Sequence, residues 1–491
     1  MAATSVFESY FGDVSLVRLL LQRGLAAVYF VAFLNALNQF KPLLGERGLL
    51  PVPAYLRHVG FREAPSLFHV RYSDRLLTAV AWTGLALSLA AVTGASECGP
   101  WWLSLPIWLL LYALYLSIVN VGQTFYGFGW ESMLLEAGFF AAFLGPVGLR
   151  PSLVPVLALR WLLFRVELGA GLIKLRGDRC WRDLTCLCFH YETQPLPNPL
   201  SRTFHHLPRP FQRMSVAFSH LIQLVVPFGL FAPQPVASVA GVLIVVHQLL
   251  LIVSGNYAWL NWLTVVLGCS AFSDETLALV LSFTTPRALQ RPLVFELALY
   301  ALAAATLLLS IRPTLNLVSK RQAMNEAYNP WHLVGSYGAF GSVTRERYEV
   351  VVEGSSELEP QDGVFREYAF KGKPGAVGRQ PGQFAPYHLR LDWLMWFLPL
   401  RIPVKRPGFV PHRHELWFLR LVEKLLEGDR PALSLLATNP FPDTPPRFVR
   451  ASLYRYEFTV RNERKQTGDV WKRTRVGDYL PALSLEDLRR G

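Results

Sequence analysis

The chain has 491 residues, of which 52% are hydrophobic and 14 are Trp, and its mean hydropathy is +0.27. This composition excludes an ordinary soluble enzyme and indicates a multi-pass membrane protein embedded in a lipid bilayer. The net charge is +13. The basic residues are nevertheless spread along the chain without a stripe of interleaved aromatics, so we expect no nucleic-acid partner.

Nine apolar windows have the length that a bilayer requires, roughly 15–24 residues. The first window contains Arg18 and Arg23 and is followed by no small-residue cleavage site, so it predicts a retained span rather than a signal peptide. The predicted spans lie at about residues 18–37, 76–94, 101–121, 130–145, 152–175, 215–232, 236–254, 256–272 and 293–311. We therefore expect a polytopic α-helical membrane domain over residues 1–322, including an extramembrane loop at 176–214.

The window 152–175 is unusual because it carries Arg160, Glu167 and Lys174 at intervals of seven residues. At about 3.6 residues per turn, this spacing places all three side chains on one face of a helix. Successive members lie roughly 10 Å apart along the helix axis. Their counter-charges are therefore expected from other elements, water or a substrate, because ionisable groups at membrane depth are rarely left unpaired.

Two interpretations of this charged face stay open. In the first, Arg160 and Glu167 join Glu131 and Glu136 of the preceding span in a structural network that fixes helix packing. In the second, the face lines a polar cavity that binds a ligand. Side chains on later spans that could extend such a cavity are His220, His247 and Gln248.

The polar loop 176–214 holds three of the five cysteines. Cys180, Cys186, Cys188 and His190 follow a C-x5-C-x-C-x-H spacing that fits no standard zinc site, so we predict no metal. A nucleophile pair of Cys188 and His190 would lack an orienting third group. A disulfide between Cys180 and Cys186 is chemically reasonable if the loop faces an oxidising compartment.

The composition changes near residue 323. Residues 1–322 hold 38 charged side chains, whereas the 169 residues from 323 onward hold 45 and contain no window long enough to span a bilayer. Alternating or β-branched runs predict strands at Tyr348–Val352, Phe365–Phe370 and Phe448–Val460, and helical spacing predicts a helix over Glu415–Leu426. We expect a β-rich α+β extramembrane domain over residues 323–491.

An apolar run in this second domain contains Trp393, Trp396 and Phe397. It fits a buried core, a surface that docks on the membrane, or a surface that takes up apolar segments of a folding client. The domain shows no Ser-His-Asp order, Gly-rich phosphate loop or metal-ligand box. We therefore predict no cofactor and favour a protein that is not an enzyme.

Charge counts bear on orientation and source. The loops 38–75 and 176–214 fall on one side of the predicted topology and contain six Lys or Arg each, which the positive-inside rule assigns to the cytoplasm. Arg outnumbers Lys by 39 to 9, and no Asn-x-Ser/Thr sequon occurs. Both features lean toward a bacterial source and hence an inner-membrane protein.

Three blocks of sequence carry a family resemblance. The first is GFGWESMLLEAGF at 127–139. The second runs from Arg160 to the loop CWRDLTCLCFHYETQPLPNP at 180–199. The third combines YNPW at 328–331, RLDW at 390–393 and NPF at 439–441. Together they resemble the lipase maturation factor family, polytopic membrane proteins that in animals help secreted lipases to fold in the endoplasmic reticulum.

This resemblance implies a folding factor whose partner is a client protein such as a lipase. It places the 176–214 loop and the C-terminal domain on the lumenal or periplasmic side, opposite to the side that the charge count gives. Within the loop, His190 and Glu192 are the expected polar contacts to the client, and Asn198 can stabilise the turn between two prolines. The interpretation that these three residues only brace the loop stays open.

A second resemblance concerns Lys174. The run Ala170-Gly171-Leu172-Ile173-Lys174-Leu175, followed by Trp181, is similar to the helix end that holds the catalytic lysine in vitamin K-dependent gamma-carboxylase-type membrane domains. It implies a desolvated base at Lys174, and hence an integral-membrane enzyme as the alternative to a folding factor. In the simpler interpretation, Lys174 ends its span and extends to the headgroups. A transporter is a third class.

Overall fold

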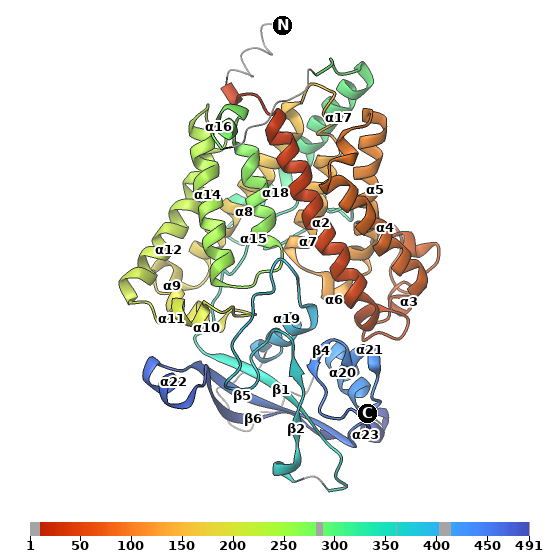
Figure 1. Cartoon of the computed structure of the whole chain (residues 1–491), viewed down its shortest axis with the longest axis vertical. Helices are drawn as coiled ribbons and strands as arrows, with labels where there is room; N and C mark the ends of the chain where they lie inside the picture. The colour runs from red at the N-terminus through yellow and green to blue at the C-terminus, as the bar shows by residue number, and fades with distance from the viewer. Residues whose placement is uncertain (1–9, 281–287, 360, 402–413, 491) are drawn as a thin grey trace.

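The computed structural model describes residues 10–280, 288–359, 361–401 and 414–490. A bundle of long helices forms one end of the molecule and a sheet with short helices forms the other (Figure 1). Helix α2 begins at the end of the bundle far from the sheet, and the last helix, α23, lies in the sheet domain.

The bundle consists of long helices joined by loops and short helical turns. Its longer helices are α2 (Ser15–Leu44), α4 (Asp74–Val92), α5 (Trp101–Asn120), α7 (Gly129–Ala141), α8 (Leu153–Arg176), α12 (Arg209–Leu224), α14 (Val236–Ser254), α15 (Leu260–Gly268), α17 (Leu293–Leu309) and α18 (Ile311–Val318). Its short helices are α3 (Val52–Tyr55), α6 (Gln123–Tyr126), α9 (Arg179–Arg182), α10 (Leu187–Thr193), α11 (Ser201–His205), α13 (Val226–Gly229) and α16 (Asp274–Ala278).

Five helical segments in the described ranges are long and apolar enough to cross a bilayer: α2, α4, α5, α14 and the continuous stretch of α17 with α18. The nine predicted spans are therefore not confirmed as a set. With 13 and 9 residues, α7 and α15 fall short of the roughly 20 that a span needs. With 24 residues, α8 is long enough to cross a bilayer, but it carries too many charged side chains to count among these five segments.

Glycines let α8 approach its neighbours closely. A Cβ on Gly169 would lie 2.2 Å from the carbonyl oxygen of Tyr337, and one on Gly171 would lie 2.8 Å from a methyl group of Leu224. Both distances are too short for a carbon atom. The Gly-Ala-Gly run therefore lets α8 pack between α12 and the segment that leads into the sheet domain.

The sheet domain is built on four antiparallel strands in the order β2-β1-β5-β6, beside a separate pair, β3 with β4. The long pairing joins β1 to β5 from Arg347 opposite Tyr456 to Ser355 opposite Phe448. Its strands are β1 (Arg347–Ser355), β2 (Arg366–Glu367), β3 (Ala369–Phe370), β4 (Leu436–Thr438), β5 (Phe448–Phe458) and β6 (Trp471–Leu483). Its helices are α19 (Arg390–Phe397), α20 (Leu416–Leu426), α21 (Arg430–Leu433), α22 (Arg461–Thr467) and α23 (Leu485–Arg490).

Three of the predicted elements in this domain occur with shifted ends: β1, β5 and α20. The strand predicted over Phe365–Phe370 is instead two strands of two residues each, because β2 pairs with β1 while β3 pairs with β4. Strand β6 was not predicted, because its burial does not alternate: no residue from Lys472 to Asp478 is buried.

The apolar run at 393–397 forms part of α19, which the sequence analysis did not predict. Trp393 is buried and its ring packs against Trp130 of α7, with 5.1 Å between the ring centroids. Phe397 at the end of the helix is 36% exposed. The run therefore joins the two domains, with one exposed aromatic at its end.

Residues 323–346 pack on the bundle before the chain reaches β1. The side chain of Gln322 donates to the carbonyl of Gly169, and that of Arg165 donates to the carbonyl of Gly335. The Tyr337 hydroxyl donates to Glu136. The change in composition near residue 323 thus precedes the spatial start of the sheet domain.

Candidate functional site

A cavity of about 620 Å³ lies where α7, α8, α12, α14 and α15 meet the 180–199 loop and α19. Its volume falls in the range of roughly 300–1,000 Å³ that is typical of small-molecule sites. Two members of the charged face, Glu167 and Lys174, line it together with His247 and Gln248. Four of the residues considered for a polar cavity are therefore brought together in one.

Each of the two charged residues in the cavity has a polar neighbour on another helix. Gln248 of α14 donates to Glu167 Oε1 at 2.7 Å, and Lys174 Nζ donates to Gln223 Oε1 of α12 at 2.6 Å. Lys174 Nζ also lies 5.0 Å from the centroid of the Trp181 ring. Lys174 is only 7% exposed, so its ammonium group does not reach headgroups from the end of α8.

Arg160 lies outside this cavity, and it bonds to backbone carbonyls rather than to Glu131 or Glu136. Its guanidinium donates to two backbone carbonyls, those of Ser270 at 2.5 Å and Leu230 at 3.3 Å. Leu230 caps the C-terminus of α13, and Ser270 lies in the short turn that follows α15. Helix C-termini present free carbonyls with partial negative charge, so they can compensate a buried cation without a carboxylate.

The two acidic residues of α7 pair with other arginines. Glu136 forms an ion pair with Arg165, and Glu131 accepts from Arg390 Nη1 at 2.8 Å. All four side chains are at most 1% exposed. The second pair joins α7 to α19 of the sheet domain, and Arg390 also donates to Asn35 Oδ1 of α2 at 2.8 Å. The three family blocks contain both acids and Arg390, but the sequence predicted no partner for Arg165 or Arg390.

His220 also lies apart from the cavity lining. Its Nε2 is 3.0 Å from the carbonyl oxygen of Trp181. This contact ties α12 to the start of the loop, which is a packing role rather than a ligand-binding one.

The loop is held between the bundle and the sheet. From the bundle, Asn256 Nδ2 donates to the Pro197 carbonyl at 3.1 Å. From the sheet, Arg347 of β1 donates to the carbonyls of Glu192, Gln194 and Pro195. These bonds satisfy the backbone of a proline-rich segment that forms no ladder of its own.

The three candidate residues of the loop are buried. His190 Nε2 lies 2.8 Å from the Tyr257 hydroxyl, and a Glu192 carboxylate oxygen accepts from the Phe458 N–H at 2.7 Å. Asn198 donates to the Val253 carbonyl at 2.9 Å. Their exposed fractions are 8%, 9% and 2%. Side chains that are enclosed and bonded in this way favour the interpretation that these residues brace the loop.

Burial controls the ionisation of the loop. It raises the pKa of Glu192 to about 7, although the hydrogen bond from Phe458 acts in the opposite direction. His205 Nε2 lies 3.5 Å from the Glu192 carboxylate, and burial lowers the pKa of His205 to about 4. Between about pH 4 and about pH 7, therefore, the Glu192 carboxyl group is protonated and the His205 ring is neutral. The contact is therefore not an ion pair there.

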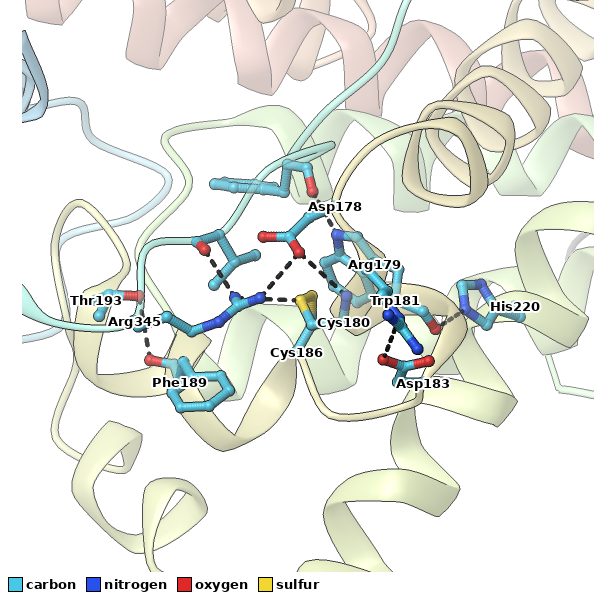
Figure 2. Close-up of a disulfide and its surroundings, with 12 residues drawn as sticks. Asp178, Arg179, Cys180, Trp181, Asp183, Cys186, Phe189, Thr193, His220 and Arg345 are labelled. Carbon is cyan, nitrogen blue, oxygen red and sulfur yellow. Dashed lines mark hydrogen bonds and ion pairs between the residues drawn. A yellow bond between two sulfur atoms is a disulfide. The ribbon is translucent and has the colours of Figure 1, made fainter.

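The structure joins Cys180 and Cys186 by a disulfide, with 4.8 Å between their Cα atoms (Figure 2). Arg345 lies beside it: its guanidinium donates to Asp178 Oδ1 at 2.9 Å and approaches Cys180 Sγ at 3.4 Å. Asp178 in turn accepts from the Cys180 N–H at 3.1 Å. The bridge thus fixes the turn between α8 and α10.

Comparison with known proteins identifies the family. A model described as "Lipase maturation factor transmembrane domain" matches residues 16–279, and one described as "Lipase maturation factor C-terminal domain" matches residues 333–481. The chain belongs to the lipase maturation factor family. Lipase maturation factor 1 of Mus musculus is 40% identical over 99% of this chain and 90% of its own length.

Two human relatives show the breadth of this match. Lipase maturation factor 1 of Homo sapiens is 42% identical over 97% of this chain and 89% of its own length, and lipase maturation factor 2 of Homo sapiens is 31% identical over 96% and 83%. No solved structure gives a significant match. These mammalian relatives lend no support to the bacterial source or to the carboxylase-type enzyme that the sequence analysis considered.

Proposed function

We propose that this protein is a membrane-bound maturation factor that helps secreted proteins, in particular lipases, to fold. The observation that carries the proposal is the similarity to lipase maturation factors over nearly the whole chain, at about 40% identity. Both the membrane part and the C-terminal part match models of that family. The similarity therefore covers both predicted domains, 1–322 and 323–491, rather than a shared membrane scaffold alone.

We infer that the chain crosses the membrane nine times and that the loop and the sheet domain face the lumen of the endoplasmic reticulum or the periplasm. In support, α6, α10 and α11 lie at the sheet end of the bundle and α16 at the opposite end (Figure 1). The Cys180–Cys186 disulfide also favours an oxidising compartment for the loop.

Complementation tests the function. Cells that lack their own lipase maturation factor would express this chain together with a secreted lipase. We expect it to raise secreted lipase activity while leaving lipase mRNA unchanged, because the defect lies in folding rather than in synthesis. Unchanged secretion of every lipase tested, with the protein present in the membrane, would contradict the proposal.

A further inference from the structure

The cavity contains buried polar atoms that the protein itself does not satisfy. Glu167 Oε2, His247 Nδ1 and Asn261 Nδ2 have no hydrogen-bond partner within the described part of the chain. Their residues line the cavity and are only 0%, 3% and 3% exposed. Unsatisfied polar atoms cost free energy when buried, and three of them around one cavity point to a polar group of a ligand.

The chemistry of these atoms defines that polar group. Glu167 Oε2 can only accept when ionised, Asn261 Nδ2 can only donate, and His247 Nδ1 can do either, depending on its tautomer. A hydroxyl group both donates and accepts, so it can serve all three. Glu167 and Lys174 bring opposite formal charges to the same cavity, which favours a head group without net charge over an anion or a cation.

The remaining lining is largely apolar and reaches the outside of the bundle. Val166, Phe218 and Leu251 supply apolar wall, and Leu250 of α14 lines the cavity while being 47% exposed. The outer face of the neighbouring α12 is apolar in its later turns, where Met214 and Leu221 are 65% and 50% exposed, whereas its first turns expose two arginines. Helix α14 is long and apolar enough to cross a bilayer, so the cavity opens beside a helix face that lipid would cover.

We propose that this cavity binds a neutral, hydroxyl-bearing lipid with a single hydrocarbon chain, which enters from the bilayer between α12 and α14. The hydroxyl groups meet Glu167, His247 and Asn261, and the chain lies along the apolar wall. A volume of about 620 Å³ suits a ligand of this size rather than a segment of a folding client. The inference goes beyond the proposed function and does not depend on the lipase client.

A photoactivatable, clickable monoacylglycerol tests the assignment on the purified full-length protein in lipid nanodiscs. We expect crosslinks on peptides from α8, α12 and α14, competed by unlabelled monoolein. Ser219→Phe, on the cavity side of α12, should abolish specific labelling, whereas Ala217→Phe on the exposed side of the same helix should leave it unchanged. Glu167→Gln should weaken binding by about tenfold, because a hydrogen bond to a charged acceptor is lost.

Three outcomes would overturn the proposal. They are equal labelling of Ser219→Phe and Ala217→Phe, equal labelling by probes with a fatty-acid or lysophosphatidylcholine head, and labelling confined to lipid-exposed faces. Thermal unfolding shows whether each variant is folded. Monoolein should also raise the melting temperature of the wild type and of Ala217→Phe. If Ser219→Phe fails to fold, Glu167→Gln alone decides, and undiminished binding by this folded variant contradicts the assignment.

Discussion

Buried charges in the bundle differ in how completely they are satisfied. Glu136 accepts from Arg165, from the Gly335 N–H at 3.0 Å and from the Tyr337 hydroxyl at 2.8 Å. Glu167 accepts from Gln248 through Oε1, and Oε2 has no partner of hydrogen-bond geometry among the residues that the structure describes. The first arrangement stabilises packing, whereas the second leaves capacity for a ligand.

This difference predicts opposite sensitivities of two otherwise similar substitutions. Glu136→Gln should lower the free energy of unfolding by about 3–5 kcal/mol, because it leaves the Arg165 guanidinium buried without a counter-charge. Glu167→Gln serves as the matched control on the next helix and should cost much less. Thermal unfolding in detergent measures both. If Glu167→Gln proved as destabilising as Glu136→Gln, Glu167 would belong to the structural framework instead.

The pKa of Glu192 makes stability depend on pH. Burial raises this pKa from 4.5 to about 7. As the pH rises between these values, the unfolded chain releases the proton before the folded one does, so the contribution of Glu192 to stability is lost. Glu192→Gln cannot ionise. We therefore expect this variant to gain stability relative to the wild type from about pH 5 to pH 7, measured by unfolding in detergent, and a constant difference would contradict the raised pKa.

Among the structural elements, the 180–199 loop connects the helical bundle to the sheet domain. It meets α14 and the connection that follows α14 on one side and β1 and β5 on the other, and the disulfide fixes its first turn. A change in the structure of the loop should therefore weaken the contacts of both domains.

Loss of the disulfide should destabilise this loop. Cys180→Ser should lower the free energy of unfolding by about 2 kcal/mol, the value expected from the entropy of a short closed loop. Cys188→Ser, which removes a free cysteine in the same loop, is the matched control and should have little effect. Thermal unfolding with and without reductant measures this. Equal stability of reduced and oxidised protein would show that the bridge does not support the loop.

An element could be predicted where its own sequence carries a pattern, and not where it depends on distant residues. Strand β1 contains a β-branched run and helix α20 has apolar residues at helical spacing, so both were predicted. The charge spacing on α8 correctly grouped Glu167 with Lys174 but not with Arg160, because a backbone carbonyl leaves no signature in the sequence. The Arg390–Glu131 pair escaped prediction for a related reason: its members lie 259 residues apart.

At the scale of the whole molecule, the helices alternate direction so that the loop and the sheet domain lie at one end of the bundle (Figure 1). Cys98, which is free and exposed, lies in the connection between α4 and α5. The family resemblance implied a lumenal sheet end, whereas the positive-inside rule assigns the same end to the cytoplasm. Sequence reasoning therefore predicted the shared side without a unique orientation.

Labelling with a membrane-impermeant thiol reagent decides the orientation. Leu200→Cys in the loop and Leu358→Cys in the sheet domain are suitable because these residues are 47% and 73% exposed. In a background without Cys188 and Cys269, both should react only from the lumenal or periplasmic side, and native Cys98 only from the cytoplasm. Reaction of the two engineered cysteines from opposite sides would contradict the nine-span topology.

We propose that the protein acts on the folding of its client. A pulse-chase of a secreted lipase measures this directly, as the fraction of labelled lipase that becomes active and protease-resistant before secretion. With this protein in cells that lack their own maturation factor, that fraction should rise while the labelled lipase made in the pulse stays constant. An unchanged folded fraction, or a rise explained entirely by more lipase synthesis, would contradict it.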